Sequence, residues 1–423
     1  MFTQKNFSNG LRLLTAPVEG TKSVTVLILV GAGSRYESDR ERGIAHFLEH
    51  MFFKGGKKYD TPKKVSETID SIGGDFNAFT GKEYAGYYVK CSGDFIETAF
   101  DVLSDMLIST KLAAEDIERE RGVILEELNM YQDAPMYQVG WDFEHLLFGD
   151  TPMGRDQIGL PETIRAFSAD DFRAYRHDLY TADNTVLVVA GDITPEKAEE
   201  LTESFFSFDD RKKSRSFDAV LEKTAENRVS VREKKTEQAH LVMGFPGVPF
   251  GHPQEYAARL LSVILGGNMS SRMFLSVREE KGLCYSIHTS TDQYSDTGVL
   301  STHAGVDLRR VPEAIAAISE EYRRIAEEGI EEAELAKAKS FLKGKLTLRM
   351  EDSEERASFF GVQAILRGEV FPLEELFQKI ESVSREDVQS IARTLLTPEQ
   401  CHLSLIGPFS GREQEFSNII SQQ

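Results

Sequence analysis

Cysteine is scarce in this chain of 423 residues, which contains only Cys91, Cys284 and Cys401. Their number is odd and their spacing is wide, so they exclude a disulfide framework and do not form the clustered pairs of a cysteine-type metal site. So low a cysteine content is typical of a protein that works in a reducing compartment.

Long hydrophobic runs are also absent. The longest strongly apolar run, Val24–Val30, is far too short to cross a bilayer. The first residues, Met1–Phe7, show neither the apolar core of a secretory signal nor the Arg- and Ser-rich pattern of a transit peptide. These features predict a cytoplasmic protein that has no membrane partner.

Basic residues are fewer than acidic ones, with 49 Lys and Arg against 69 Asp and Glu. The resulting formal net charge of -20 disfavours binding to a nucleic-acid backbone, so we expect no nucleic-acid partner. Hydrophobic residues make up 40% and charged residues 28% of the chain, which is ordinary for a globular protein. The length suffices for two or three domains with sizeable cores.

The chemistry that is present is concentrated in the stretch Gly43–Phe53, whose pattern predicts a helix that is apolar in most directions. At about 100° per residue, His46 and His50 lie one turn apart on the same face, with Glu49 beside them. Such a helix is normally buried, so its three polar groups need partners. Two core histidines bonded to backbone groups would satisfy this need. A divalent cation would also do so, with Glu49 as base, which is the inverted form of the zinc-protease signature.

A second helix, predicted to begin near Asp116, places two carboxylates on its apolar side. On a helical wheel with Glu120 at 0°, the apolar residues of this helix lie between about -60° and +80°, and Glu127 lies at about -20°. Glu118 and Glu126 point away from this sector and are expected in solvent. Because buried carboxylates must be paired, we predict that Glu127 is the third metal ligand and that Glu120 supports the site. The apolar residues of the sector are Ile117, Val123, Ile124, Leu128 and Tyr131.

The order of predicted elements repeats after about 210–220 residues, which indicates two domains of the same fold. We place the domains at residues 1–210 and 228–423, joined by a polar linker at 211–227. In the second half, the helix that corresponds to the histidine helix reads Glu255–Leu260 and lacks the His-His-Glu set. One metal site is therefore expected per chain.

With the run His46–His50 followed by Glu127, the chain resembles the pitrilysin, insulinase and mitochondrial processing peptidase family over essentially its whole length. The resemblance implies a processing-peptidase-like α+β fold of two homologous domains, each a mainly antiparallel sheet packed with helices. It also implies Zn²⁺ held by His46, His50 and Glu127, with Glu49 as general base and Glu120 beside the ligands. Supporting matches are Gly33–Arg35, Asn77–Thr80, Glu120–Glu127 and Arg278–Tyr285.

Two further groups are assigned by the resemblance. The strand containing Asn77, Ala78 and Phe79 is implied to pair with an extended substrate by β-augmentation, and ordinary hairpin pairing is the alternative. Arg278 and Tyr285 match a pair that, in the family, reaches the zinc site from a C-terminal domain and stabilises the tetrahedral intermediate. Arg278 has acidic neighbours in sequence, so a surface ion pair is the alternative for it.

The leading hypothesis is a zinc metalloendopeptidase that cleaves unstructured peptides or extended protein segments inside an enclosed chamber. The chain has half the length of long pitrilysin-like members, and only a short turn stands at Gly266–Asn268, where the non-catalytic processing-peptidase subunit has a long glycine-rich loop. We therefore expect a catalytic chain that forms a homodimer, or a heterodimer with a paralogue, in which Arg278 and Tyr285 act in the partner's site. The alternatives are a non-catalytic scaffold or partner subunit and a zinc enzyme that acts on a small molecule.

Overall fold

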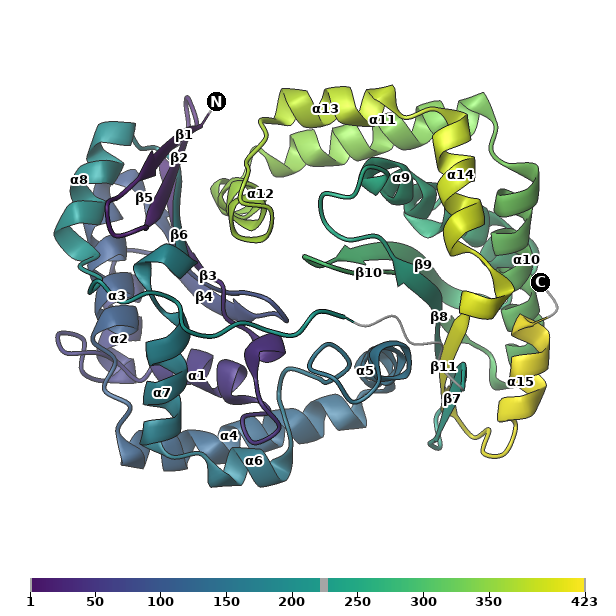
Figure 1. Ribbon diagram of the computed structural model, residues 1–423, viewed down its shortest axis with the longest axis horizontal. Helices are drawn as coiled ribbons and strands as arrows, with labels where there is room; N and C mark the ends of the chain where they lie inside the picture. Colours follow the sequence, from purple (N-terminus) through teal and green to yellow (C-terminus); the bar gives the residue numbers. More distant parts are fainter. Residues whose placement is uncertain (1, 221–226, 422–423) are drawn as a thin grey trace. The chain divides into compact units, whose positions relative to one another are not determined.

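The computed structural model describes residues 2–220 and 227–421, which divide into two compact units (Figure 1). Each unit is a β-sheet packed with helices, as the predicted α+β class requires. Unit 1 comprises Met1–Asn129, Asp156–Asp218 and Thr347–Pro372, and unit 2 comprises Met130–Arg155, Ala219–Leu346 and Leu373–Gln423.

The sheet of unit 1 has six strands in the order β1-β2-β6-β3-β5-β4. The β2/β6 pair is parallel and all other neighbouring pairs are antiparallel. Strand β3 is buried on both faces, as its run of aliphatic and β-branched residues predicts. Strand β4 pairs with β5 alone and ends the sheet. The strands are β1 Thr3–Asn6, β2 Arg12–Pro17, β3 Ser23–Val30, β4 Asp75–Thr80, β5 Ala85–Ser92 and β6 Thr185–Gly191.

One face of this sheet is covered by a helix from the second half of the sequence, α12 (Ser353–Leu366), which packs on β3 and β6. Gly361 permits the close approach, because a Cβ there would come within 2.5 Å of a methyl carbon of Leu29. The hydroxyls of Thr25 and Ser353 share a buried hydrogen bond of 2.8 Å. The other helices of unit 1 are α1 Ile44–Phe52, α2 Pro62–Ser71, α3 Ile96–Ile108, α4 Ala114–Asp133, whose last residues enter unit 2, α6 Pro161–Ala166, α7 Ala169–Leu179 and α8 Pro195–Phe205.

The sheet of unit 2 has five strands in the order β7-β11-β8-β10-β9, with β7 and β11 parallel. The strands are β7 Val229–Glu233, β8 Ala239–Gly247, β9 Cys284–Gln293, β10 Gly298–Val306 and β11 His402–Gly407. The helices are α5 Pro135–Phe148, α9 Glu255–Gly266, α10 Val311–Glu328, α11 Glu332–Arg349, whose last residues enter unit 1, α13 Leu373–Ser382, α14 Arg385–Leu395 and α15 Glu413–Ile420. Short helical segments of both units are η1 Ser34–Tyr36, η2 Gly93–Phe95, η3 Ala182–Asn184, η4 Phe274–Glu280, η5 Leu308–Arg310 and η6 Pro398–Gln400. None of the described helices is long and apolar enough to cross a membrane.

The two sheets repeat one topology, which confirms the predicted internal repeat. Apart from the additional strand β1, the order β2-β6-β3-β5-β4 of unit 1 corresponds to β7-β11-β8-β10-β9 of unit 2. Each series begins with the parallel pair and ends on an edge strand, β4 or β9. The edge strand β4 is the one that the sequence analysis assigned to substrate binding.

The compact units differ from the contiguous ranges 1–210 and 228–423, because each sheet takes one helix from the other half of the chain. Helix α12 belongs to unit 1, and helix α5 belongs to unit 2, where Val139 and Phe143 join the cluster that contains Val242. The central strands β3, β6 and β11 are buried on both faces, so each sheet requires a second helical layer. Such an exchange over more than a hundred residues leaves no local pattern in the sequence.

The predicted linker, residues 211–227, is in part a packed segment of unit 1. Arg215 forms ion pairs with Glu41 at 2.9 Å and with Asp178 at 3.1 Å, and Lys213 Nζ donates a hydrogen bond of 2.9 Å to the Tyr36 hydroxyl. These contacts tie residues 213–215 to the segment that precedes α1 and to helix α7. Residues 221–226 of the predicted linker lie outside the described residues.

Candidate metal centre

Helix α1 begins at a turn whose backbone conformation favours glycine. Gly43 has φ of +93°, and a Cβ there would come within 2.1 Å of the carbonyl oxygen of Ile158. The carboxylate of Glu37 accepts hydrogen bonds of 2.9 Å from the N–H groups of Gly43 and Ala45, which satisfies donors that a helix start leaves free. Burial raises the pKa of Glu37 to about 8, although these two hydrogen bonds act to lower it.

The apolar residues of α1 are buried and leave one polar face. His46, Glu49 and His50 occupy that face and are only partly exposed. The ring centroids of His46 and His50 lie 4.8 Å apart, as expected for residues one turn apart on a helix. The helix therefore has the two-sided character that its periodicity predicts. The buried residues, each at most 1% exposed, are Ile44, Ala45, Phe47, Leu48, Met51 and Phe52.

Helix α4 presents Glu120 and Glu127 to the site and leaves Glu118 and Glu126 exposed, as predicted. The prediction is wrong for one residue of the apolar sector, because Val123 is 50% exposed. Val123 lies at the edge of that sector, at about -60° on the wheel. The fully buried residues Ile117, Ile124 and Leu128 centre the stripe on positive angles, so the sector is narrower than predicted.

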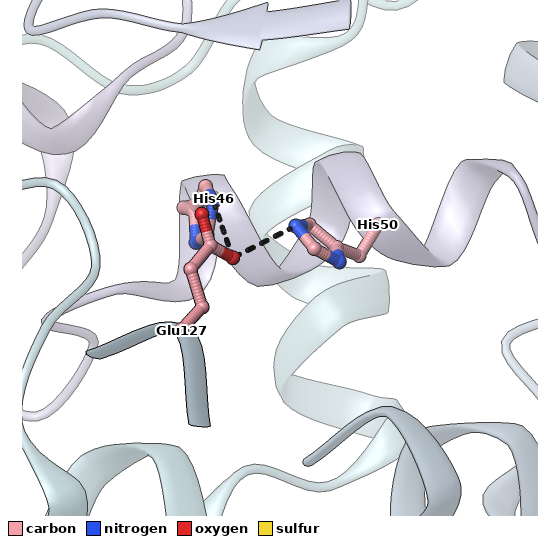
Figure 2. A group of neighbouring side chains, drawn as sticks. All are labelled: His46, His50 and Glu127. Carbon is pink, nitrogen blue, oxygen red and sulfur yellow. Dashed lines mark ion pairs between the residues drawn. The ribbon is translucent and has the colours of Figure 1, made fainter. Parts of the chain in front are cut away.

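The two helices bring His46, His50 and Glu127 together (Figure 2). Oε2 of Glu127 lies 3.6 Å from Nε2 of His46 and 3.5 Å from Nε2 of His50, and one ligand atom of each residue lies within 4.8 Å of the others. Tetrahedral zinc with bonds of about 2.0–2.1 Å spaces its ligand atoms roughly 3.3–3.4 Å apart. The observed spacing is therefore close to that of a zinc site.

Glu120 orients the imidazole of His50 through the ring nitrogen that faces away from Glu127. Nδ1 of His50 lies 2.9 Å from Oε1 of Glu120, and Glu120 also forms a close ion pair with Lys54. Burial acts to raise the pKa of Glu120, but the hydrogen bonds from His50 and Lys54 outweigh it and the pKa is lowered. Because an ionised carboxylate only accepts, Nδ1 carries the proton and Nε2 keeps its lone pair toward Glu127.

Burial, and to a lesser extent the neighbouring His50, lower the pKa of His46 to about 3. Its imidazole is therefore neutral at pH 7 and can act as a ligand. Burial also raises the pKa of Glu127. The lone pair of His50 Nε2 and the carboxylate of Glu127 are both acceptors, and they face each other at 3.5 Å. A divalent cation would satisfy this arrangement, so these residues fit a zinc ion.

Glu49 lies on the same face of α1 but contacts a different partner. The hydroxyl of Thr80, the last residue of β4, donates a hydrogen bond of 2.5 Å to Oε2 of Glu49. Burial raises the pKa of Glu49, and the Thr80 hydrogen bond and the nearby His50 only partly offset this effect. Glu49 is thus a partly buried carboxylate outside the three-residue cluster.

The strand residues Asn77, Ala78 and Phe79 lie on β4, the edge of the sheet. Side chains alternate along a strand, so Ala78 and Thr80 share one face while Asn77 and Phe79 share the other. Thr80 meets α1 on the first face. On the second face Phe79 packs edge-on against Tyr84, with ring centroids 6.1 Å apart. The side chain of Phe79 therefore has a packing role.

Arg278 and Tyr285 belong to unit 2 and lie near each other there. The guanidinium of Arg278 lies 4.4 Å from the ring centroid of Phe274 and 5.9 Å from that of Tyr285. Arg278 also forms an ion pair of 3.1 Å with Glu279, which is the contact that its surface interpretation expects. Tyr285 is 78% exposed in the single chain.

Three residues of the site were not singled out from the sequence: Glu37, Lys54 and Thr80. Thr80 stands at the end of the matched run Asn77–Thr80, and strand alternation would have placed it on the face opposite Phe79. Lys54 follows His50 by four residues, so helical spacing could have placed it on the same side of the chain as His50. Glu37 binds the N-terminus of α1 from outside the helix. It therefore takes no part in the helical periodicity, and no signal in the sequence pointed to it.

Comparison with known proteins finds relatives that match this chain over nearly its whole length. A protein of Bacillus subtilis described as an uncharacterized zinc protease is 36% identical over 409 residues, which cover 96% of this chain and 98% of that protein. Another so described, from Streptomyces coelicolor, is 33% identical over 410 residues, with 96% and 89% covered. This chain belongs to peptidase family M16. The family model of insulinase (peptidase family M16) matches residues 12–151, and that of the peptidase M16 inactive domain matches residues 166–342.

The two M16 matches divide the site residues unequally. His46, His50 and Glu127 lie in the insulinase match, and Arg278 and Tyr285 lie in the inactive-domain match. In the described part of this M16 chain, the first three form the one group of three or more His, Cys, Asp or Glu that could hold a metal ion. The inactive-domain match therefore does not include the metal cluster.

Solved structures share the M16 fold across essentially the whole chain. A protease from Helicobacter pylori aligns with a TM-score of 0.86 at 23% identity, covering 96% of this chain and 99% of that chain. A peptidase M16 inactive domain from Pseudomonas fluorescens aligns at 0.89 with 17% identity, covering 96% and 98%. A chain of complex III2 from Candida albicans aligns at 0.83 with 19% identity, covering 99% of both. The fold is the one that the sequence predicted.

Proposed function

We propose that this M16 chain is a zinc-dependent endopeptidase that cleaves unstructured peptides or extended protein segments. The observation that carries the proposal is the convergence of two imidazole nitrogens and one carboxylate oxygen at the spacing of a tetrahedral zinc site. His46, His50 and Glu127 would hold the ion. When bound, zinc supplies a Lewis acid that polarises a carbonyl and lowers the pKa of water toward about 7.

Glu49 is the residue that moves the proton. It lies beside the ligands on α1 and makes no ion pair with a cation in the described chain. Its carboxylate would take the proton of the attacking water and pass it to the nitrogen of the departing amine. A carboxylate whose pKa is raised by burial is suited to this work, because it is a stronger base than an exposed one.

The edge strand β4 is the proposed substrate platform. Its outer backbone groups have no partner strand in the described chain, and its end lies against Glu49. An extended peptide that paired with Asn77 and Ala78 would run beside the catalytic face of α1. Recognition through backbone groups favours flexible chains, since most backbone groups of a folded protein are already paired.

We also retain the proposal that two chains assemble, as a homodimer or with a paralogue. Tyr285 is exposed in unit 2 and the half-buried Arg278 lies beside it, so the pair would stabilise the tetrahedral intermediate in a partner chain. A non-catalytic partner subunit remains the rival function, because part of the chain matches an inactive-domain model. The complete ligand set, together with Glu49, favours catalysis.

The test compares wild-type protein with the Glu49→Gln variant. Wild-type protein should contain about one zinc per chain and cleave unstructured peptides at internal bonds. Glu49→Gln should keep its zinc and lose activity by roughly 10²–10⁴-fold, the usual contribution of a general base. Elemental analysis and mass spectrometry of the peptide products give both readouts. A wild-type protein that holds zinc but leaves every peptide intact would favour the non-catalytic role.

A further inference from the structure

The hydroxyl of Thr80 makes the one hydrogen bond that the described chain gives to the carboxylate of Glu49. It reaches Oε2 at 2.5 Å, and Oε1 receives no hydrogen bond from the described residues. The two residues are 31 positions apart and come from different elements, the end of β4 and the last turns of α1. The contact therefore joins the edge strand to the helix that carries the metal cluster.

The backbone behind Thr80 is held firmly in place. The turn that follows closes with a hydrogen bond of 2.9 Å from the N–H of Gly81 to the carbonyl of Tyr84. The N–H groups of Ser34 and Arg35 in η1 donate to the carbonyls of Gly81 and Lys82 at 3.2 and 2.8 Å. These bonds hold the backbone that directly follows Thr80.

A buried ion pair strengthens the same turn. Arg35 and Glu83 lie 2.5 Å apart, and their side chains are only 1% and 3% exposed. Breaking such a pair would leave an uncompensated buried charge, so the pair keeps η1 and the turn together. An anchored donor of this kind can fix the orientation of a partner in a way that a mobile surface side chain cannot.

We propose that Thr80 is a positioning residue for Glu49: its hydroxyl holds Oε2 and leaves Oε1 as the oxygen that takes the proton. This inference rests on the proposed endopeptidase function. A carboxylate on a flexible glutamate side chain has several orientations, and hydrogen bonding of one oxygen selects among them. A neutral hydroxyl orients the carboxylate without the charge neutralisation that an Arg or Lys partner would bring.

The arrangement also links substrate binding to the base. Thr80 ends the strand on which Asn77 and Ala78 are proposed to pair with substrate, so the strand that aligns the scissile bond also aligns Glu49. Both alignments are then set by one rigid element. A displacement of β4 by a small distance would misplace the substrate and the base together.

The experiment compares Thr80→Val, which is nearly isosteric and lacks the donor, with Thr80→Ser, which keeps it. On an unstructured fluorogenic peptide, Thr80→Val should lower kcat by roughly 10- to 100-fold, a part of the full general-base contribution. Thr80→Ser should stay within about threefold of wild type, and KM should change little in both variants. Zinc content and zinc affinity, measured by chelator competition, should match those of wild type.

Two further proteins make the test specific. Thr202→Val removes a buried hydroxyl that donates 2.7 Å to the carbonyl of Ala198 in α8, and it should leave kcat unchanged. In the Glu49→Gln background, adding Thr80→Val should change the residual rate by less than about twofold, because a residue that acts only through Glu49 has nothing left to position.

The outcomes separate this inference from the proposed function. A wild-type protein that cleaves no peptide overturns both. A wild-type enzyme whose Thr80→Val variant keeps full kcat overturns the positioning role alone. The same conclusion follows if Thr80→Ser is as slow as Thr80→Val, or if Thr80→Val loses zinc.

Discussion

Nδ1 of His50 donates to Oε1 of Glu120 at 2.9 Å, and Glu120 is in turn paired with Lys54. This relationship fixes which nitrogen of His50 carries the proton and directs Nε2 toward Glu127. His46 has no such support, since its Nδ1 is buried without a hydrogen-bond partner among the described residues. The two imidazoles of the cluster are therefore held unequally, and Glu120 supports His50 alone.

Replacing Glu120 by Gln should weaken zinc binding by roughly 10- to 100-fold, the usual effect of removing a group that orients a metal ligand. The amide is neutral and pairs poorly with both Lys54 and His50. Chelator competition measures the dissociation constant. Glu118→Gln is the matched control, because Glu118 lies on the exposed side of the same helix. Equal affinities in the two variants would remove Glu120 from the site.

Replacing Glu127 by Gln should abolish stoichiometric zinc binding, because a charged ligand of the cluster is lost. Glu126→Gln, the next residue on α4, should bind zinc as wild type does, because Glu126 is exposed. Elemental analysis after dialysis gives the result. Zinc loss in both variants, or in neither, would reject the assignment of Glu127.

Glu37 should contribute to the stability of the metal-free protein an amount that is lost as pH rises from about 4.5 to 8. Burial, and to a lesser extent the nearby carboxylates of Glu41 and Asp156, raise the pKa of Glu37 to about 8. The pKa of a glutamate in an unfolded chain is about 4.3. Within this window the folded protein holds a proton that the unfolded chain has released, so the associated stability is present at low pH and lost as pH rises.

The check is thermal unfolding at intervals from pH 5 to pH 8 in the presence of a chelator. Glu37→Gln cannot titrate, so its Tm should decline less steeply over this range than that of wild type. Glu19→Gln, an exposed glutamate of the same unit, should follow the wild-type slope. A Glu37→Gln profile parallel to wild type would contradict the assignment of the slope to Glu37.

Mixing Glu49→Gln protein with Tyr285→Phe protein should restore activity if Tyr285 acts in a partner chain. A mixed dimer would contain one site with both residues intact, and symmetric dimers have two equivalent sites. Peptide cleavage after subunit exchange should reach a fraction of the wild-type rate. Glu49→Gln mixed with Glu127→Gln is the control, because both changes damage the zinc half of a site and should not complement. No recovery despite demonstrated exchange would place Tyr285 within its own chain or outside the reaction.

Local periodicity was enough to predict the faces of α1 and α4. The spacing of His46, Glu49 and His50, and the contrast of Glu120 and Glu127 with Glu118 and Glu126, follow from 3.6 residues per turn and a buried stripe. Val123 marks the limit of the method, because a wheel locates the centre of a stripe better than its edge.

The sequence by itself therefore determined the histidine helix, the face of α4 and the candidate ligands, because each of these leaves a short-range pattern of polarity, and the order of the predicted elements indicated the repeat. Only the tertiary structure decided which distant groups meet. The hydroxyl of Thr80 reaches Glu49, Lys54 reaches Glu120, and α12 covers the sheet of unit 1. Contacts of this kind depend on how sheet edges and helices pack after chain reversals, and a single hydrogen bond between distant residues has no periodicity from which it could be predicted.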